Sequence, residues 1–202
     1  MGVMAGHLEA SVEAPPLLRD FNGWMVAEQR RIFLLCFRML RDRDEADTAT
    51  QDVFLKAYKA LSRPSAPELD NPGKWLTRIA VNTCLDRLRS RSWKLWKRRS
   101  RPEDEELILR TKAAEAPTAE DEAYAHQIRR RLAEAISRLS PRQQAVFTLR
   151  HYEDRSLEEI AEILGLEVGT VKAHMARALA KLRVLLEDLY GVRHAGAVGE
   201  SR

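Results

Sequence analysis

Residues 156–182 carry the start and stop signals of two short helices joined by a tight turn. Ser156 and Glu159 have the spacing of a capping box, in which each side chain accepts the other's backbone N–H at a helix start. Gly165 follows the apolar residues of the first helix, where a helix end favours a left-handed glycine. A second helical pattern begins after Glu167. This order predicts a helix-turn-helix, whose second helix enters the DNA major groove.

The second of these helices has two unlike faces. Its apolar side recurs at helical spacing through Val168, Val171, Met175, Ala178 and Leu182. Its opposite side is a strip of small residues, flanked by longer polar ones: Gly169, Ala173, Ala176 and Ala180, with Thr170, Lys172 and Arg177 beside them and His174 at the edge. Small residues allow close approach to base edges, while the flanking side chains reach bases and phosphates. We predict a DNA-reading face; the alternative is a plain helical hairpin with a solvated outer face.

Apolar residues recur at helical spacing in further segments, centred on residues 32–40, 54–61, 75–83 and 128–139. In the second of these, Phe54, Ala57, Tyr58 and Leu61 share one face. A loop with three prolines spans 62–73, and Asn71 and Pro72 can start the helix after it. No segment sustains the period-two alternation of a strand. We therefore predict an all-α protein of two small helical domains joined by a flexible linker, the C-terminal one a helix-turn-helix.

Changes in composition suggest where these domains begin and end. The stretch after residue 97 starts basic, turns acidic and contains little that would form a core. We expect a flexible N-terminal tail, a first helical domain, a linker, a second helical domain and a C-terminal tail, at residues 1–20, 21–97, 98–117, 118–188 and 189–202.

The distribution of charge and the number of cysteines limit which kinds of functional site the sequence can form. The net charge is only +4, but residues 87–101 are free of acidic side chains and surround Trp93 and Trp96. Such a run is either a solvated helix end or a nucleic-acid contact. The chain has two cysteines and five histidines, without the spacing of a metal site, so we expect no metal and no cofactor. Cys36 and Cys84 are expected to be reduced, buried thiols; a redox pair is the alternative.

No stretch approaches the roughly 20 apolar residues that a membrane helix needs, and the N-terminus lacks the pattern of a signal peptide. The sequence therefore predicts a cytoplasmic protein without membrane insertion.

Three segments resemble the extracytoplasmic-function sigma factors, the smallest members of the main bacterial sigma family. They read TQDVFLKAYKAL (50–61), KWLTRIAVNTCLDRLRS (74–90) and SLEEIAEILGLEVGTVKAHMARALAKLR (156–183), and they occur in the family's order. The resemblance extends over about residues 21–186. It implies a non-catalytic subunit that binds bacterial core RNA polymerase and promoter DNA to direct initiation. It also implies an anti-sigma partner and a monomer when free of polymerase.

The resemblance also assigns residues to three surfaces. The surface that docks on core polymerase would contain Asp47, Gln51, Asp52, Phe54 and Leu55. The part that reads and melts the −10 element would contain Leu69, Asp70 and Asn71 in a pocket for a flipped base, with Trp75, Arg78 and Asn82 on the next helix. The −35 element would be contacted by Lys172, Ala173, Ala176 and Arg177, beside Thr170 and His174.

The sequence departs from the family pattern in three places, one of which is that Ala173 and Ala176 are smaller than the residues that many family members have there. The family usually has an acidic residue at the position of Thr48, where the nearest carboxylate here is Asp47. Pro64 and Pro67 replace a simple glycine-rich segment in the loop before the −10 helix. The polymerase contact and the −10 preference are therefore expected to differ in detail.

Two other functions fit parts of the sequence. A helix-turn-helix regulator without sigma activity would share the terminal domain, but such regulators normally follow a βα receiver domain, and no such pattern precedes it here. An enzyme acting on nucleic acid would need a metal cluster, a P-loop or a nucleophile elbow, and the sequence has none of these motifs.

Overall fold

The computed structural model describes residues 16–90 and 119–187, and within these ranges the regular structure is entirely helical. The prediction of an all-α protein is confirmed. The predicted linker at 98–117, the tryptophans of the basic run, and most of both predicted tails lie outside the described residues. No helix in the described part of the chain is long and apolar enough to cross a membrane.

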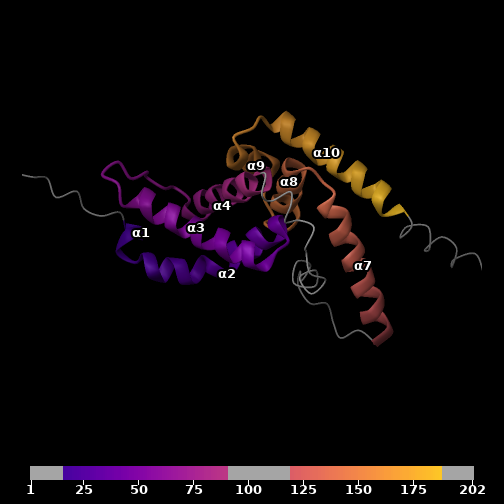
Figure 1. Ribbon diagram of the computed structural model, residues 1–202. Helices are drawn as coiled ribbons and strands as arrows, with labels where there is room; N and C mark the ends of the chain where they lie inside the picture. Colours follow the sequence, from indigo (N-terminus) through magenta and orange to yellow (C-terminus); the bar gives the residue numbers. More distant parts are fainter. Residues whose placement is uncertain (1–15, 91–118, 188–202) are drawn as a thin grey trace, which may run out of the picture.

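The described helices follow one another in the order shown in Figure 1. They are α1 (Pro16–Arg19), α2 (Phe21–Leu40), α3 (Arg43–Leu61), α4 (Pro72–Arg89), α7 (Ala119–Ser137), α8 (Pro141–His151), α9 (Leu157–Leu164) and α10 (Val168–Leu185).

The predicted helix boundaries are formed by the predicted capping residues. Asn71 caps α4, its side-chain oxygen accepting the Lys74 N–H at 2.8 Å, with Pro72 in the first turn. Ser156 forms the predicted capping box at the start of α9, and Ser140 forms a second capping box at the start of α8. Gly165 ends α9 in the left-handed conformation, with φ 62° and ψ 46°. These local signals therefore set the helix ends that the sequence predicted.

Helices α2, α3 and α4 form a first module around a fully buried core, seen in violet and magenta in Figure 1. Large apolar side chains from all three helices fill it, among them Ile32, Phe37, Val53 and Leu76. Cys36 and Cys84 are buried, unbridged thiols inside it, as expected. The neighbouring Cys36 and burial together raise the pKa of Cys84, which favours its uncharged form.

Helices α7 to α10 form a second module, in which α8 and α9 lie next to the first module and α10 lies on the outer side (Figure 1). One buried cluster joins α7, α8 and α10 through Ile136, Leu139, Phe147, Ala178 and Leu182.

The two modules pack directly against each other. Helix α8 contacts α2 and α4, and α9 also contacts α4. The core of the first module continues without interruption into Leu149 of α8, Ile160 and Ile163 of α9, and Val171 of α10. Two helical domains are therefore present, but in this structure they share a hydrophobic core.

Candidate nucleic-acid interface

A surface cavity of 260 Å³ opens where the loop before α4 meets the first turns of that helix. Five of the six residues predicted to read the −10 element line it: Leu69, Asp70, Asn71, Trp75 and Arg78. Asn82 does not line the cavity, but it is exposed on α4 at a spacing that places it on the face of Trp75 and Arg78. We call this cavity the −10 pocket.

The chemistry of the −10 pocket comes from different local structures. The loop supplies a carboxylate and an amide, from Asp70 and Asn71. Helix α4 supplies an aromatic wall, because Trp75 packs partly against the hydrophobic core and is held there. Arg78 adds a cation on the exposed side. A polar rim beside an aromatic wall is suited to an unpaired base, which stacks on one face and hydrogen-bonds at its edge.

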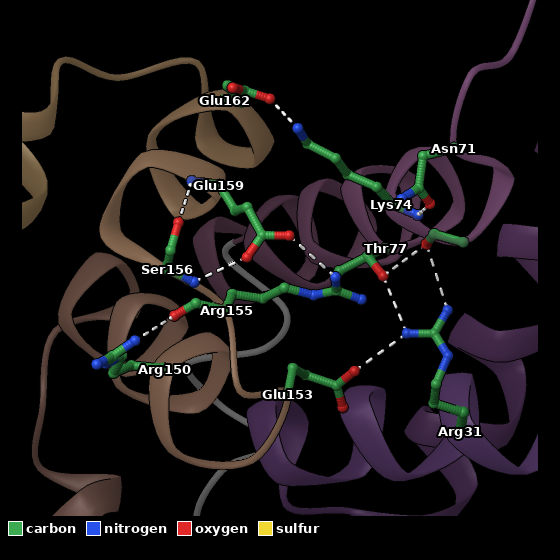
Figure 2. Close-up of polar contacts among 11 residues, drawn as sticks. Arg31, Asn71, Lys74, Thr77, Arg150, Glu153, Arg155, Ser156, Glu159 and Glu162 are labelled. Atoms are coloured by element: carbon green, nitrogen blue, oxygen red, sulfur yellow. Dashed lines mark hydrogen bonds and ion pairs between the residues drawn. The ribbon is translucent and has the colours of Figure 1, made fainter.

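Two further residues of the first module line the pocket and were not predicted from the sequence. These residues are Glu68 and Lys74. The only sign in the sequence that they belong to the pocket is that they are adjacent to Leu69 and Trp75 in the chain. Two further lining residues, Glu162 and Ile163, come from α9 in the second module. Lys74 pairs with Glu162 across this boundary, as Figure 2 shows. The pocket is thus partly covered by the second module.

The outward face of α10 is arranged as its periodicity predicted. Val171, Ala178 and Leu182 are buried, and Val168 and Met175 pack against the core from the same side. On the other side, Thr170, Lys172, Ala176 and Arg177 are exposed, whereas Ala173 and His174 are half-buried. We call this exposed side, from Gly169 to Ala180, the α10 face. It presents two cations beside small residues, which suits a helix that must approach base edges closely.

His174 lies at the edge of the α10 face in an unusual environment. Its Nδ1 atom is buried and has no hydrogen-bond partner among the described residues. Burial lowers the pKa of His174, and the positive charges of Arg177 and Arg142 lower it further. Both effects favour the neutral form of the imidazole.

The first turn of α9, the helix that precedes α10, is held by two hydrogen bonds and an ion pair. The Ser156 hydroxyl accepts the Glu159 N–H at 3.1 Å, and the Glu159 carboxylate accepts the Ser156 N–H at 2.8 Å. Arg155 pairs with the same carboxylate at 3.2 Å (Figure 2). The Ser156 N–H and the Arg155 charge lower the pKa of Glu159 despite some burial. These contacts fix the start of α9, and Gly165 ends the helix at the turn that leads into α10.

The predicted polymerase-docking residues on α3 fall into two groups. Asp47, Gln51 and Leu55 are exposed, and the first two also line a 400 Å³ cavity between α2 and α3. Asp52 is half-buried and pairs with Arg87 of α4, which also pairs with Glu45. The negative charge of Asp52 is therefore partly neutralised within the chain.

Phe54, which the resemblance places on the polymerase-docking surface, is buried in this structure, and its contact with polymerase remains a prediction. Its side chain is only 5% exposed and lies edge-on to Phe21 and Trp24, with ring centroids 6.5 Å away in each case. The helical pattern, which grouped Phe54 with Ala57 and Leu61, agrees with this burial. Tyr58, grouped with them, is instead 48% exposed.

Within residues 16–90 and 119–187, no group of three His, Cys, Asp or Glu side chains is placed to hold a metal ion.

Comparison with known families gives two matches in the order of the modules. Residues 25–94 match the Sigma-70 region 2 model, and residues 129–182 match the Sigma-70, region 4 model. The chain is 31% identical to the ECF RNA polymerase sigma factor SigW of Bacillus subtilis, over 79% of this chain and 84% of that protein. It is 28% identical to the RNA polymerase sigma-E factor of Streptomyces avermitilis, over 84% and 86% of the respective chains.

Two solved structures share the fold. The sigma factor RpoE, in complex with the anti-sigma factor NepR from Bartonella quintana, aligns with a TM-score of 0.59 and 22% identity, over 84% of this chain and 98% of that one. CnrH, in complex with the cytosolic domain of CnrY, aligns with a TM-score of 0.52 and 24% identity, over 82% and 87% of the chains.

Proposed function

The chain belongs to the sigma-70 family, among its extracytoplasmic-function sigma factors, and on that premise we propose how its two modules divide promoter recognition. As an alternative sigma factor it directs transcription initiation from promoters. In our proposal the first module, at 21–97, binds core polymerase and the −10 element, and the second, at 118–188, binds the −35 element. The chain itself performs no catalysis and acts in the cytoplasm, where bacterial RNA polymerase works.

The −10 pocket is the single observation that carries the proposal for the first module. A base leaves the duplex stack at a cost of a few kcal/mol, so a site that offers both stacking and hydrogen bonds is needed to offset this cost. Trp75 offers the stacking surface, and Asp70 and Asn71 offer polar atoms at its edge. Arg78 lies where it would face the strand's phosphates. Asn82, farther along the same face, contacts a second unpaired base.

The α10 face is proposed to bind the −35 element in the major groove. Lys172 and Arg177 supply long donors for guanine edges and phosphates, and Thr170 supplies a hydroxyl. Ala173 and Ala176 keep the helix close to the bases, and His174 lies beside a phosphate. Because the small residues make few polar contacts, specificity depends mainly on Lys172, Arg177 and the shape of the groove.

The exposed residues of α3 are proposed to dock on core polymerase. Leu55 is 51% exposed and flanked by the polar Gln51 and Asp52, which gives an apolar contact with a polar rim. We also propose an anti-sigma partner for this chain, which is a monomer when free of polymerase. The structural neighbour RpoE is bound to an anti-sigma factor, and this supports the proposal.

Transcription in vitro tests the function directly. The purified chain and bacterial core polymerase are incubated with a genomic DNA library, and RNA 5′ ends are mapped. We expect starts at a defined set of sites that share two sequence elements, and no such starts when the chain is omitted. A chain that does not bind core polymerase, or that binds promoter DNA only as a dimer on repeated half-sites, would contradict the proposal.

A further inference from the structure

The packing of the two modules conflicts with their proposed targets on DNA. The −35 and −10 elements are separated by about 25 base pairs, or about 85 Å at 3.4 Å per base pair. In the structure, however, Lys74 of the −10 pocket pairs directly with Glu162 on α9, within the helix-turn-helix. A chain in this arrangement cannot engage both elements at once.

We propose that this arrangement is a closed state in which the second module occupies the −10 face, and that a buried Glu153 fastens it shut. The surface of the first module that binds promoter DNA thus has an intramolecular partner, whose acidic groups are Glu153, in the turn between α8 and α9, and Glu162 on α9. The two modules must separate before the chain engages a promoter. This inference rests on the proposed function, because it assumes that the −10 pocket and the α10 face bind DNA.

Glu153 connects three parts of the chain, as Figure 2 shows in part. It lies in the turn between α8 and α9, and its side chain is only 5% exposed. One carboxylate oxygen lies 3.0 Å from Nη1 of Arg31, and the other lies 3.7 Å from Nη1 of Arg38, both on α2. Arg31 also donates to the Thr77 hydroxyl at 3.0 Å and the Gly73 carbonyl at 3.3 Å, both on α4. A buried carboxylate needs such cations, since an unpaired charge there is strongly unfavourable.

The C-terminal end of α2 is completed by the second module. The last carbonyls of a helix have no partner within it. Gln144 of α8 is buried and its amide donates to the Arg38 and Met39 carbonyls, at 3.1 Å each. Arg41, at the end of α2, donates to the Ala133 carbonyl of α7. The contact between the modules is therefore a specific polar fit in addition to a shared apolar core.

Helix α9 supplies the part of the closed state that masks the DNA site. Glu162 and Ile163 line the −10 pocket, so α9 lies where the melted strand would run. Glu162 places a carboxylate on Lys74, a cation that phosphate would otherwise contact. An acidic side chain on this face repels DNA as well as blocking it.

The closed state also contains a feature that favours its release. Arg38 is 4.4 Å from the ring centroid of Tyr152, and its Nε atom is buried without a hydrogen-bond partner among the described residues. Leaving such a donor unsatisfied is unfavourable, and separation of the modules would return it to water. Contacts with polymerase and DNA, made only by the separated modules, would then shift the population toward the open state.

Single-molecule energy transfer between the modules tests the closed state. Dyes are placed on Asp86→Cys in α4 and Arg183→Cys in α10, two exposed positions, while the native cysteines are fully buried. We expect the free chain to give one compact population. Glu153→Gln should raise the extended population at least about fivefold. Asp154→Asn, which removes the same charge from an exposed neighbour with left-handed backbone, should leave it unchanged.

Control measurements and one further variant accompany this experiment. Circular dichroism checks that each variant retains its helices, and Glu162→Gln, with its side chain 62% exposed, should give a smaller shift in the same direction. Core polymerase added to the unsubstituted labelled chain should convert the compact population into the extended one. An extended free chain, or equal behaviour of Glu153→Gln and Asp154→Asn, would overturn the closed state. Transcription by the unsubstituted chain, measured in parallel, would show that the proposed function survives that result.

Discussion

The −10 pocket and the α10 face are both proposed to bind promoter DNA, yet the structure leaves one covered and the other open. Glu162 and Ile163 of α9 lie against the −10 pocket, whereas Lys172, Ala176 and Arg177 on α10 face solvent. The difference shows that accessibility is decided by how the modules pack, and not by the residues of each surface alone. Of the two proposed DNA sites, one is thus exposed in this structure and the other is partly covered by α9.

The two surfaces also differ in how they are built. The α10 face is formed by one helix, so its residues are placed by helical periodicity and by the turn at Gly165. The −10 pocket combines a loop, the first turns of α4 and a side chain anchored in the core. Substitutions should therefore affect the two surfaces independently if the division of roles is right.

The largest expected effect is at the aromatic wall of the −10 pocket. Trp75→Ala removes the stacking surface and should weaken binding of the unpaired −10 strand by about 3 kcal/mol, the upper part of the range for base stacking on an aromatic ring. Duplex −35 binding should not change. Binding is measured with fluorescent single-stranded and duplex oligonucleotides from a mapped promoter. Trp24→Ala, on α2 and away from the pocket, is the matched control; an equal loss of strand binding in both variants would argue against the pocket.

A smaller effect is expected on the α10 face. Arg177→Ala should weaken −35 duplex binding by about 2 kcal/mol, and the loss should be concentrated at one base pair because a bidentate base contact is removed. Competition among duplexes with single base-pair changes measures this. Arg183→Ala, exposed near the end of the same helix, should reduce affinity only slightly. A uniform loss across all −35 sequences would identify Arg177 as a phosphate contact instead.

The turn that orients the α10 face should respond to a backbone change. Gly165 has positive φ, so Gly165→Ala should lower the free energy of unfolding by about 1 kcal/mol, although the added methyl group meets no described atom within 4 Å. Gly169→Ala has equal space in a helical conformation and should be neutral or slightly stabilising. Denaturant unfolding distinguishes the two. If both substitutions lowered the free energy of unfolding equally, the loss at Gly165 would not come from backbone strain.

The smallest effect is a pH dependence of the second module. The Ser156 N–H, together with Arg155, lowers the pKa of Glu159. A carboxyl whose pKa is lower in the folded state stabilises that state above its unfolded pKa of about 4.3. This contribution is lost as the pH falls through the folded-state value. Glu159→Gln should therefore reduce the acid sensitivity of unfolding, measured by denaturant titration from pH 6 to pH 3, while Glu158→Gln, which lies outside the capping box, should not.

The features that the sequence predicted best are those that depend on residues adjacent in the chain, such as helix caps and tight turns. Ser156, Glu159 and Gly165 fixed the helix-turn-helix because capping and left-handed turns are local, and α10 has the predicted core side for the same reason. Five residues of the −10 pocket were found through family resemblance, since loop conformation does not follow from periodicity. The aromatic contacts that bury Phe54 could not be predicted, because they come from Phe21 and Trp24, which lie far away along the chain.

The packing between the modules could not be predicted from the sequence. Glu153 lies in a turn and belongs to no apolar pattern, so nothing in its neighbours indicated that Arg31 and Arg38 would bury it. Gln144 looks like an ordinary helical residue until the carbonyls at the end of α2 are brought next to it. Such contacts depend on the relative placement of two modules, which a single sequence does not encode in any local signal.

Footprinting of both promoter elements in one sample tests most directly the claim that the modules read them separately. Polymerase assembled with the Asn82→Ala chain is placed on a mapped promoter, and nuclease protection at −35 and permanganate reactivity of unpaired thymines at −10 are recorded together. Our account predicts full −35 protection with a large loss of −10 reactivity. A parallel decline of both signals would contradict it.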